Sequence, residues 1–303
     1  MHEVRITVPK GLSSGIAKLA FDVGIDRVTV CPVLVLPDAD ADLVSVETST
    51  PLAKTFLDRL AVSGLVDLTR ASITTREVRA LLGKSSVEEL TYPAVEPALE
   101  VFEDLWQLNH VTVSYVVRAL AAALLLAYGM LRGDVVSIVV AALFLPFTAQ
   151  VLGLGFGVWA ADWRLARQSA IALAVSLGAS VLAGALVALA FGGPQEFGGF
   201  KTPLVSLALS LIIGTAAGLS SSDDSGRRYL IGVAAAAQSG IFPVWLGIAF
   251  VLGFPDAATT AIRLATLLLN VVSIGIAAVI SYGLAGFKRE HIRRFGRYPR
   301  GTA

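Results

Sequence analysis

Six long apolar stretches dominate the sequence after residue 110, and they restrict the fold more than any other feature. A helix needs about 20 apolar residues to cross the hydrocarbon core of a bilayer, so each stretch is long enough for one span. The sequence therefore predicts an α-helical integral membrane protein of six spans. The stretches lie near residues 111–131, 135–158, 168–191, 203–220, 229–253 and 259–286.

The charged residues are concentrated ahead of these stretches. Residues 1–110 hold 10 basic and 16 acidic residues, although only 16% of the whole chain is charged. This contrast indicates a water-soluble N-terminal part followed by a membrane part. Because the soluble part is net acidic, it lacks the basic surface that nucleic-acid binding needs, and no nucleic-acid partner is expected.

The first 78 residues carry the pattern of a small α/β domain. Alternating apolar residues and helical periodicities predict the order βαββαβ, a ferredoxin-like arrangement used both for sensing small molecules and for assembly into homo-oligomers. Cys31 falls in the second strand, where we expect a buried residue rather than a reactive thiol. The predicted elements are a strand at Val4–Val8 ended by Pro9, a helix capped by Ser13, a strand at Val28–Leu36, a turn at Asp38–Asp42, a strand at Leu43–Thr48, a helix from Thr50 to Gly64 and a strand within residues 66–78.

A linker and a tail flank the membrane part. Residues 79–110 form the linker, with an amphipathic helix at 94–109 that would lie against the spans or at the membrane surface. Its expected apolar stripe consists of Ala98, Leu99, Phe102, Leu105 and Trp106. Residues 111–286 are the six-span domain, and 287–303 are a basic tail.

The basic residues between the spans predict the orientation in a cell membrane. Arg164 and Arg167 lie between the second and third stretches, Arg227 and Arg228 between the fourth and fifth, and six basic residues follow the last. Basic residues accumulate on the cytoplasmic side, so both termini are expected there.

The two halves of the membrane part resemble each other. Pro146 and Pro243 each lie in the middle stretch of three, Gln150 and Gln238 lie close by, and corresponding stretches begin about 90 residues apart. Three spans per half would make the second half inverted, and interrupted spans at matching positions in inverted halves are typical of transporter binding sites. We expect each proline to break its helix near the midplane, although proline kinks that serve only packing remain an alternative.

Polar residues inside spans are the candidate site residues. With the two prolines, the substrate-binding candidates are Pro146, Thr148, Gln150, Gln238, Ser239, Pro243 and Asn270. Arg118 lies early in the first span and either snorkels to the surface or contacts an anion.

Metal and catalytic chemistry have little support in the sequence. One cysteine and three scattered histidines cannot form a zinc-type cluster, so neither a metal nor another cofactor is expected. No His-rich, paired-Asp or Gly-x-Ser-x-Gly arrangement lies in or beside the spans, which argues against an enzyme.

Three segments resemble a family of prokaryotic membrane proteins catalogued as domain of unknown function 389. VAALFLPFTAQVLGLGFG, with Asp162 after it, is similar to the family's GAMLISPLMGPI segment and its Gly-Asp; GVAAAAQSGIFP, from Gly232, is similar to GVAIAAALVPP; LLLNVVSIGIAA carries Asn270 where the family has an Asn. The chain departs at Leu145, at Ala149–Gln150 and at Phe242, where the family has Ser, Gly-Pro and a second proline. The resemblance implies a membrane location and a small α/β domain before the spans, and no substrate.

Two functions agree with this sequence. The first is a transporter or channel-like protein for a small solute or ion, with a cytoplasmic domain for regulation or assembly. The second is a sensor or oligomeric scaffold in which the spans only anchor the front domain. A polar cavity lined by Gln150 and Gln238 would favour the first, whereas a dry, close-packed interior would favour the second.

Overall fold

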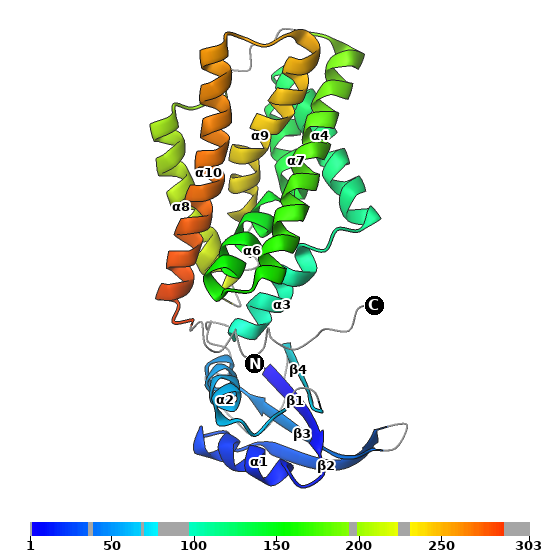
Figure 1. Ribbon diagram of the computed structural model, residues 1–303, viewed down its shortest axis with the longest axis vertical. Helices are drawn as coiled ribbons and strands as arrows, with labels where there is room; N and C mark the ends of the chain where they lie inside the picture. Colours follow the sequence, from blue (N-terminus) through cyan, green and yellow to red (C-terminus); the bar gives the residue numbers. More distant parts are fainter. Residues whose placement is uncertain are drawn as a thin grey trace. The chain divides into compact units, whose positions relative to one another are not determined.

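The computed structural model describes residues 2–35, 39–67, 70–77, 97–193, 199–223 and 231–287. These residues form two compact units, one built mainly from the residues up to Val101 and the other from Phe102 to Ser221 and from 231 to Phe287. The first unit holds a small sheet with two helices, and the second is entirely helical, as Figure 1 shows.

A four-stranded antiparallel sheet forms the first unit. The strand order is β2-β3-β1-β4, and the elements follow one another as βαββαβ. Val4, Ile6 and Val8 alternate along β1 and are buried together with residues of both helices, so α1 and α2 cover the same face of the sheet. The elements are β1 (His2–Pro9), α1 (Ser13–Asp22), β2 (Val28–Val35), β3 (Ala39–Thr48), α2 (Thr50–Ser63) and β4 (Ser72–Glu77).

Three local predictions for this unit are wrong. The strand β3 begins at Ala39, inside the segment predicted as a turn. Ser13 does not cap α1; its hydroxyl donates to Asp42 Oδ2 at 2.7 Å, and the same carboxylate oxygen accepts from the Gly11 N–H at 3.0 Å. Cys31 is exposed rather than buried, because among the described strands β2 lies at the edge of the sheet, next to β3.

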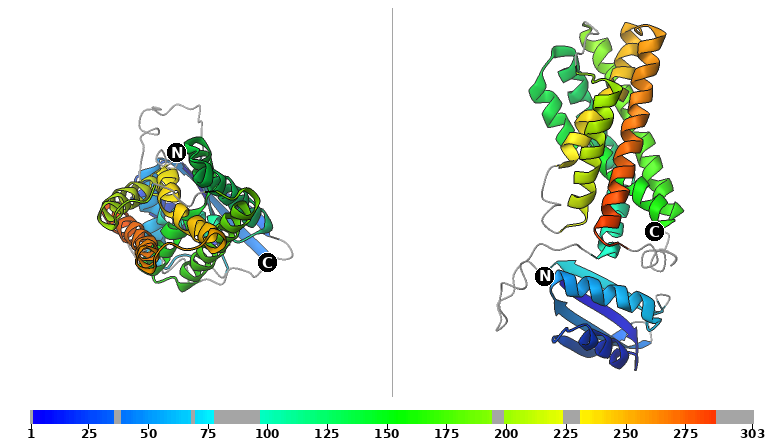
Figure 2. Two further views of the ribbon diagram at one scale, coloured as in Figure 1. Left: turned by 90° about the horizontal axis from the view of Figure 1, so that it is seen from above. Right: turned by 90° about the vertical axis from the view of Figure 1, so that its left-hand side faces the viewer.

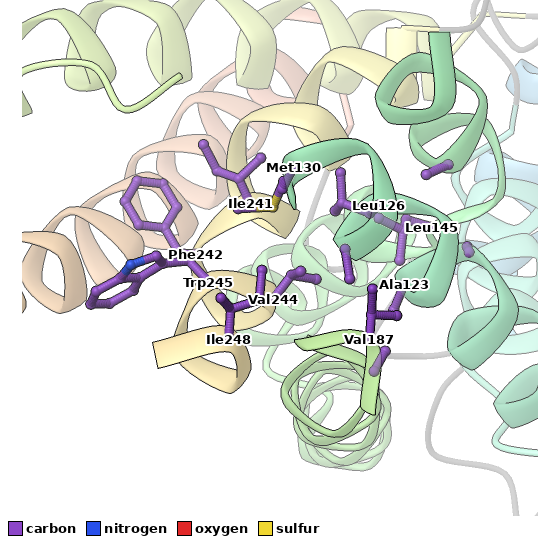
Figure 3. Close-up of a cluster of buried hydrophobic side chains, with 14 of the residues drawn as sticks. Ala123, Leu126, Met130, Leu145, Val187, Ile241, Phe242, Val244, Trp245 and Ile248 are labelled. Carbon is purple, nitrogen blue, oxygen red and sulfur yellow. The ribbon is translucent and has the colours of Figure 1, made fainter. Parts of the chain in front are cut away.

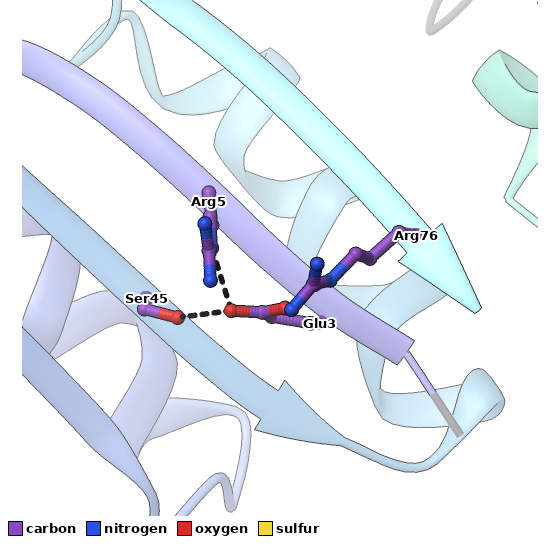
Figure 4. Close-up of polar contacts among 4 residues, drawn as sticks. All are labelled: Glu3, Arg5, Ser45 and Arg76. Carbon is purple, nitrogen blue, oxygen red and sulfur yellow. Dashed lines mark hydrogen bonds and ion pairs between the residues drawn. The ribbon is translucent and has the colours of Figure 1, made fainter. Parts of the chain in front are cut away.

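The buried carboxylate of Glu3 on β1 connects three strands, because it contacts Arg5 on β1, Ser45 on β3 and Arg76 on β4 (Figure 4). Glu3 Oε1 accepts from Arg5 Nε at 2.6 Å and from Ser45 Oγ at 3.1 Å, and Glu3 Oε2 accepts from Arg76 Nε. Burial raises the pKa of Glu3, but the hydrogen bonds to the two guanidinium groups and the hydroxyl outweigh it and lower the pKa below the ordinary value.

The membrane unit contains several helices that are long and apolar enough to cross a bilayer. Among the described residues, five helices qualify singly, and Val135–Phe144 with Phe147–Ala160 qualifies as a sixth span that is bent by 41°. The number and positions agree with the six predicted stretches. The helices are α3 (Ala98–Leu108), α4 (Val113–Arg132), α5 (Val135–Phe144), α6 (Phe147–Ala160), α7 (Trp163–Phe191), α8 (Pro203–Ser221), α9 (Ile231–Leu252) and α10 (Ala257–Leu284).

The helix α9 is the central helix of the bundle. About two-thirds (67%) of its most apolar window is buried, against 28–44% in the other four single spans. Figure 3 shows its Ile241, Phe242, Val244, Trp245 and Ile248 in one apolar cluster with residues of α4, α5 and α7. The end-on view in Figure 2 shows the other spans arranged around it.

The helix α3 of the linker packs on the spans, one of the two positions expected for it. The ring of Phe102 on α3 lies 6.4 Å from the ring of Phe156 on α6 and is tilted against it by 51°. Within the predicted apolar stripe, Phe102 and Leu105 are buried, whereas Leu99 is only half-buried. Residues 79–96, the first part of the predicted linker, lie outside the described residues.

Glycines allow α7 and α9 to approach to backbone contact. A Cβ added to Gly184 on α7 would lie 2.1 Å from the Val244 carbonyl oxygen, and one added to Gly247 on α9 would lie 1.9 Å from the Val181 carbonyl oxygen. Neither backbone can move away without separating the helices, so close packing of small residues fixes this crossing.

We expect Gly184→Ala to destabilise the membrane unit by about 1–3 kcal/mol, because the added methyl group meets backbone atoms rather than a flexible side chain. Gly178→Ala is the matched control on the same helix, since no atom lies within 4 Å of its added Cβ. The measurement is the thermal unfolding midpoint of the full chain in detergent. Equal midpoints for the two variants would show that the crossing is looser than described.

We expect Glu3→Gln to loosen β1 at neutral pH but not at low pH. Since the folded pKa of Glu3 is depressed, its stabilisation is present above the unfolded pKa of about 4.3 and is lost as the pH falls through the folded value. Amide exchange in β1, compared with the native chain at the same pH, measures this. Asp26→Asn, at an exposed position before β2, is the control, and a pH-independent effect of Glu3→Gln would contradict the ion-pair account.

Candidate functional site

The second span is interrupted at Pro146. The helix α5 ends at Phe144, Leu145 is extended with ψ of 124°, and α6 begins at Phe147. Proline has no backbone N–H and disfavours helical geometry at the residue before it, which explains why the break falls at Leu145–Pro146. The predicted break at Pro146 is present, and Gln150 follows in the first turn of α6.

Gln150 is fully buried and hydrogen-bonds to two other spans. Its Nε2 donates to Tyr115 Oη on α4 and, at 2.6 Å, to Ser176 Oγ on α7. The Tyr115 hydroxyl also lies 2.8 Å from Ser176 Oγ and donates to the Ala172 carbonyl oxygen at 3.1 Å. The amide therefore joins the broken span to both of its neighbours.

A second buried polar side chain, Asn109 at the end of α3, packs against the first turns of α6. Asn109 is fully buried, and its Nδ2 donates to the Leu105 carbonyl at 2.7 Å and to the Ala149 carbonyl at 3.0 Å. A Cβ added to Gly153 would lie 2.4 Å from Asn109 Nδ2 and 2.5 Å from Ser169 Oγ, so this glycine leaves room for both side chains.

Three buried oxygens along this side of α6 have no hydrogen-bond partner among the described residues. They are Gln150 Oε1, Asn109 Oδ1 and Ser169 Oγ. Ser169 and Ser176 lie seven residues apart on one face of α7, and Ser176 is the 14th of its 29 residues. The cluster thus extends to mid-depth in the span, where an unsatisfied polar group costs about 2–7 kcal/mol. We call these three residues, with Tyr115 and Ser176, the Gln150 cluster.

The second half has its own amide network. Gln238 on α9 donates from Nε2 to the Ser206 carbonyl at 2.9 Å and to Ser210 Oγ at 2.7 Å, both on α8. Ser210 in turn donates to Asn270 Oδ1 on α10 at 3.1 Å. Asn270 is fully buried at the 14th of the 28 residues of α10, and its Nδ2 has no partner within the part of the chain that the structure describes.

The prediction that Pro243 breaks its helix is wrong. The helix α9 continues through Pro243 from Ile231 to Leu252. A proline removes one N–H, here the donor for the Ser239 carbonyl, and α7 packs directly on the next residue through Gly184. The Ser239 hydroxyl, 1% exposed, is also without a partner among the described residues.

The two proline regions nevertheless lie against each other. A Cβ added to Gly240, three residues before Pro243, would lie 3.0 Å from Leu145 Cδ1 and 3.3 Å from Phe147 Cε2, the residues on either side of Pro146. The break in the second span therefore faces the turn of α9 that precedes its proline.

Among the described residues, Gln150 and Gln238 have no hydrogen-bond partner in common. Each bonds within its own three-span half, and an apolar cluster of Val151, Ala235 and Ile274 packs between α6, α9 and α10. Of the remaining candidates, Thr148 is half-buried on α6 and Arg118 is exposed on α4.

Sequence reasoning missed Tyr115, Asn109, Ser169 and Ser176. The two serines follow the helical period of a buried face, but serines are common in spans and their partners depend on how the helices cross. Asn109 was placed in the linker, although it is fully buried beneath α6. A stronger signal was available in the glycine at 153, which leaves space for a neighbouring polar side chain.

The chemistry available to the Gln150 cluster is that of neutral oxygen ligands. Amide and hydroxyl oxygens accept hydrogen bonds from N–H or O–H groups and coordinate monovalent cations without a buried charge. None of the helices α4 to α10 has an Asp or Glu among its own residues, although Asp134, Asp162 and Asp256 cap three of them. The described residues contain no group of three His, Cys, Asp or Glu side chains arranged to hold a metal ion.

The comparisons with known proteins agree with this architecture. The family model described as "Domain of unknown function (DUF389)" matches residues 139–276. This segment begins within α5 and ends within α10, so it contains the break at Pro146, both glutamines and Asn270. No curated protein and no solved structure matches the chain. On the evidence of this match, the part of the chain from residue 139 to residue 276 belongs to the DUF389 family of proteins.

Proposed function

We propose that the membrane unit is a transporter or channel-like protein that conducts a small polar solute or a monovalent cation past the Gln150 cluster. The observation that carries the proposal is the set of three buried oxygens without partners beside a broken span. Several kcal/mol per group is too high a cost to retain without a ligand or water that occupies the site.

The geometry also supports the proposal that the two halves are inverted repeats. In each half a glutamine of the middle span bonds to an outer span, directly to Ser176 in the first half and through Ser210 to Asn270 in the second. Ser176 and Asn270 both lie halfway along the last span of their half, and the middle spans meet at Gly240. Such pairing of the middle spans is typical of alternating-access folds.

For the first unit we propose a ferredoxin-like domain with a regulatory or assembly role. The βαββαβ order and the strand order β2-β3-β1-β4 support the fold. The edge strand β2 presents exposed Val30, Leu34 and Val35, and an apolar edge of this kind supports pairing between copies of the chain.

A scaffold function is the second candidate, and a specific observation favours it. The residues Val151, Ala235 and Ile274 of α6, α9 and α10 pack in one apolar cluster, with Val151 next to Gln150 in the sequence. In that case the polar clusters would only fix the packing of the spans, and the exposed β2 edge would be the functional surface.

Flux through liposomes that contain the full chain tests the transport proposal, with rubidium ions and glycerol as probes. We expect Gln150→Leu and Gln238→Leu each to change the flux of a transported probe about tenfold, a change equivalent to ~1.4 kcal/mol. Both variants should fold, because Tyr115 still bonds to Ser176 and Ser210 still bonds to Asn270.

Gln107→Leu, at an exposed position on α3, is the matched control and should leave flux unchanged. Flux that is unaffected by both core substitutions would exclude a path through these residues. No flux of either probe above that of empty liposomes would favour the scaffold.

We also propose that both termini lie on the cytoplasmic side of a cell membrane, which the distribution of arginines supports. The single cysteine of the chain, Cys31, is exposed and therefore reports the location of the first unit without any substitution. A membrane-impermeant maleimide should label it in permeabilised cells but not in intact cells. Labelling in intact cells would reverse the orientation.

A further inference from the structure

A surface cavity of about 590 Å³ lies at the N-terminal end of α7, and the transport proposal does not use it. Arg164, Arg167, Gln168 and Ile171 form one wall, at the spacing of a single helix face. Trp106 and His110 belong to the opposite wall, and Gln168 Nε2 joins the two walls by donating to the Trp106 carbonyl oxygen at 2.8 Å.

The length of α7 places this cavity at the surface of the bilayer. Its 29 residues span about 43 Å, whereas the hydrocarbon core is about 30 Å thick, so its ends extend into the headgroup layer. Trp163, which also lines the cavity, is 70% exposed, and tryptophan is enriched at this level because its ring is apolar and its N–H is polar.

The two guanidinium groups are available to an anion. Among the described residues no carboxylate lies within ion-pair distance of Arg164 or Arg167, and no carboxylate lines the cavity. Arginine stays charged at all relevant pH values and matches the oxygens of a phosphate group with two parallel N–H donors. The charge of the cavity therefore suits a phosphate.

The cavity also changes from polar to apolar along α7. Arg164 lies one residue into the helix, whereas Ile171, 47% exposed, lies two turns deeper, about 10 Å nearer the bilayer centre. A free phosphate ion would use only the outer end of this surface. A phospholipid would contact the whole surface, because its charged headgroup lies at the bilayer surface near Arg164 and its acyl chain extends inward toward Ile171.

We propose that this cavity binds an anionic phospholipid, with its phosphate on Arg164 and Arg167 and the start of an acyl chain against Ile171. The site lies next to the Gln150 cluster in sequence, because Gln168 of the cavity precedes Ser169 of the cluster. Lipid binding would hold α3 and α7 together at their contact through Gln168 and Trp106.

Native mass spectrometry of the full chain in detergent tests the site with phosphatidylglycerol, phosphatidylcholine of the same acyl chains, and inorganic phosphate as a competitor. We expect the chain to retain phosphatidylglycerol in preference to phosphatidylcholine. The double variant Arg164→Gln with Arg167→Gln should bind phosphatidylglycerol about 25-fold more weakly, at the usual contribution of each basic residue to anionic lipid binding.

The control pair is Arg132→Gln with Lys201→Gln, which removes the same charge; Arg132 lies over Phe191 at the opposite end of α7. The control double variant should still retain phosphatidylglycerol in preference to phosphatidylcholine. The variant Ile171→Gln should weaken phosphatidylglycerol binding about fivefold. Equal retention of the two lipids by the native chain, or an equal loss in both double variants, would overturn the site. Displacement by inorganic phosphate together with an inert Ile171→Gln would identify a free-anion site and overturn the lipid assignment.

Discussion

A polar atom enclosed by apolar packing has to find its partner inside the protein, and the membrane unit is arranged around this constraint. The break at Pro146 removes one backbone donor in the middle of a span. Buried side chains bond next to the break: Asn109 donates to the Ala149 carbonyl, and Gln150 donates to Tyr115 and Ser176. The central helix α9 meets the break with a glycine, which allows the two backbones to approach. The candidate site consists of the buried oxygens that have no partner among the described residues, such as Gln150 Oε1.

The spans were predictable because hydropathy over about 20 residues depends on composition rather than on packing. The bounds of the α/β elements were largely predictable for the same local reasons, such as the alternation in β1 and Gly64 at the end of α2. The exposed position of Cys31 was not predictable, since it depends on which strand lies at the edge of the sheet, a property of topology rather than of the segment.

The candidate site was predictable in part. The sequence indicated Gln150, Gln238 and Asn270, because amides are costly in a span, but it did not indicate their partners, which depend on helix crossings. It also assigned Pro243 the same effect as Pro146. One proline removes one hydrogen bond, and whether the helix then breaks depends on its neighbours. At Pro243 the helix α9 is continuous, and α7 packs on the next residue through Gly184. A proline in the middle span of each half therefore breaks the helix in the first half and not in the second.

The central claim is that the unpaired oxygens of the Gln150 cluster mark a site that binds a polar ligand or water. A cryo-EM map of the full chain in lipid nanodiscs, at a resolution that shows ordered water, tests it most directly. The account predicts non-protein density within about 2.7–3.2 Å of Gln150 Oε1, with further density near Asn109 Oδ1 or Ser169 Oγ. A dry cluster in which these three oxygens bond only to protein groups would contradict it.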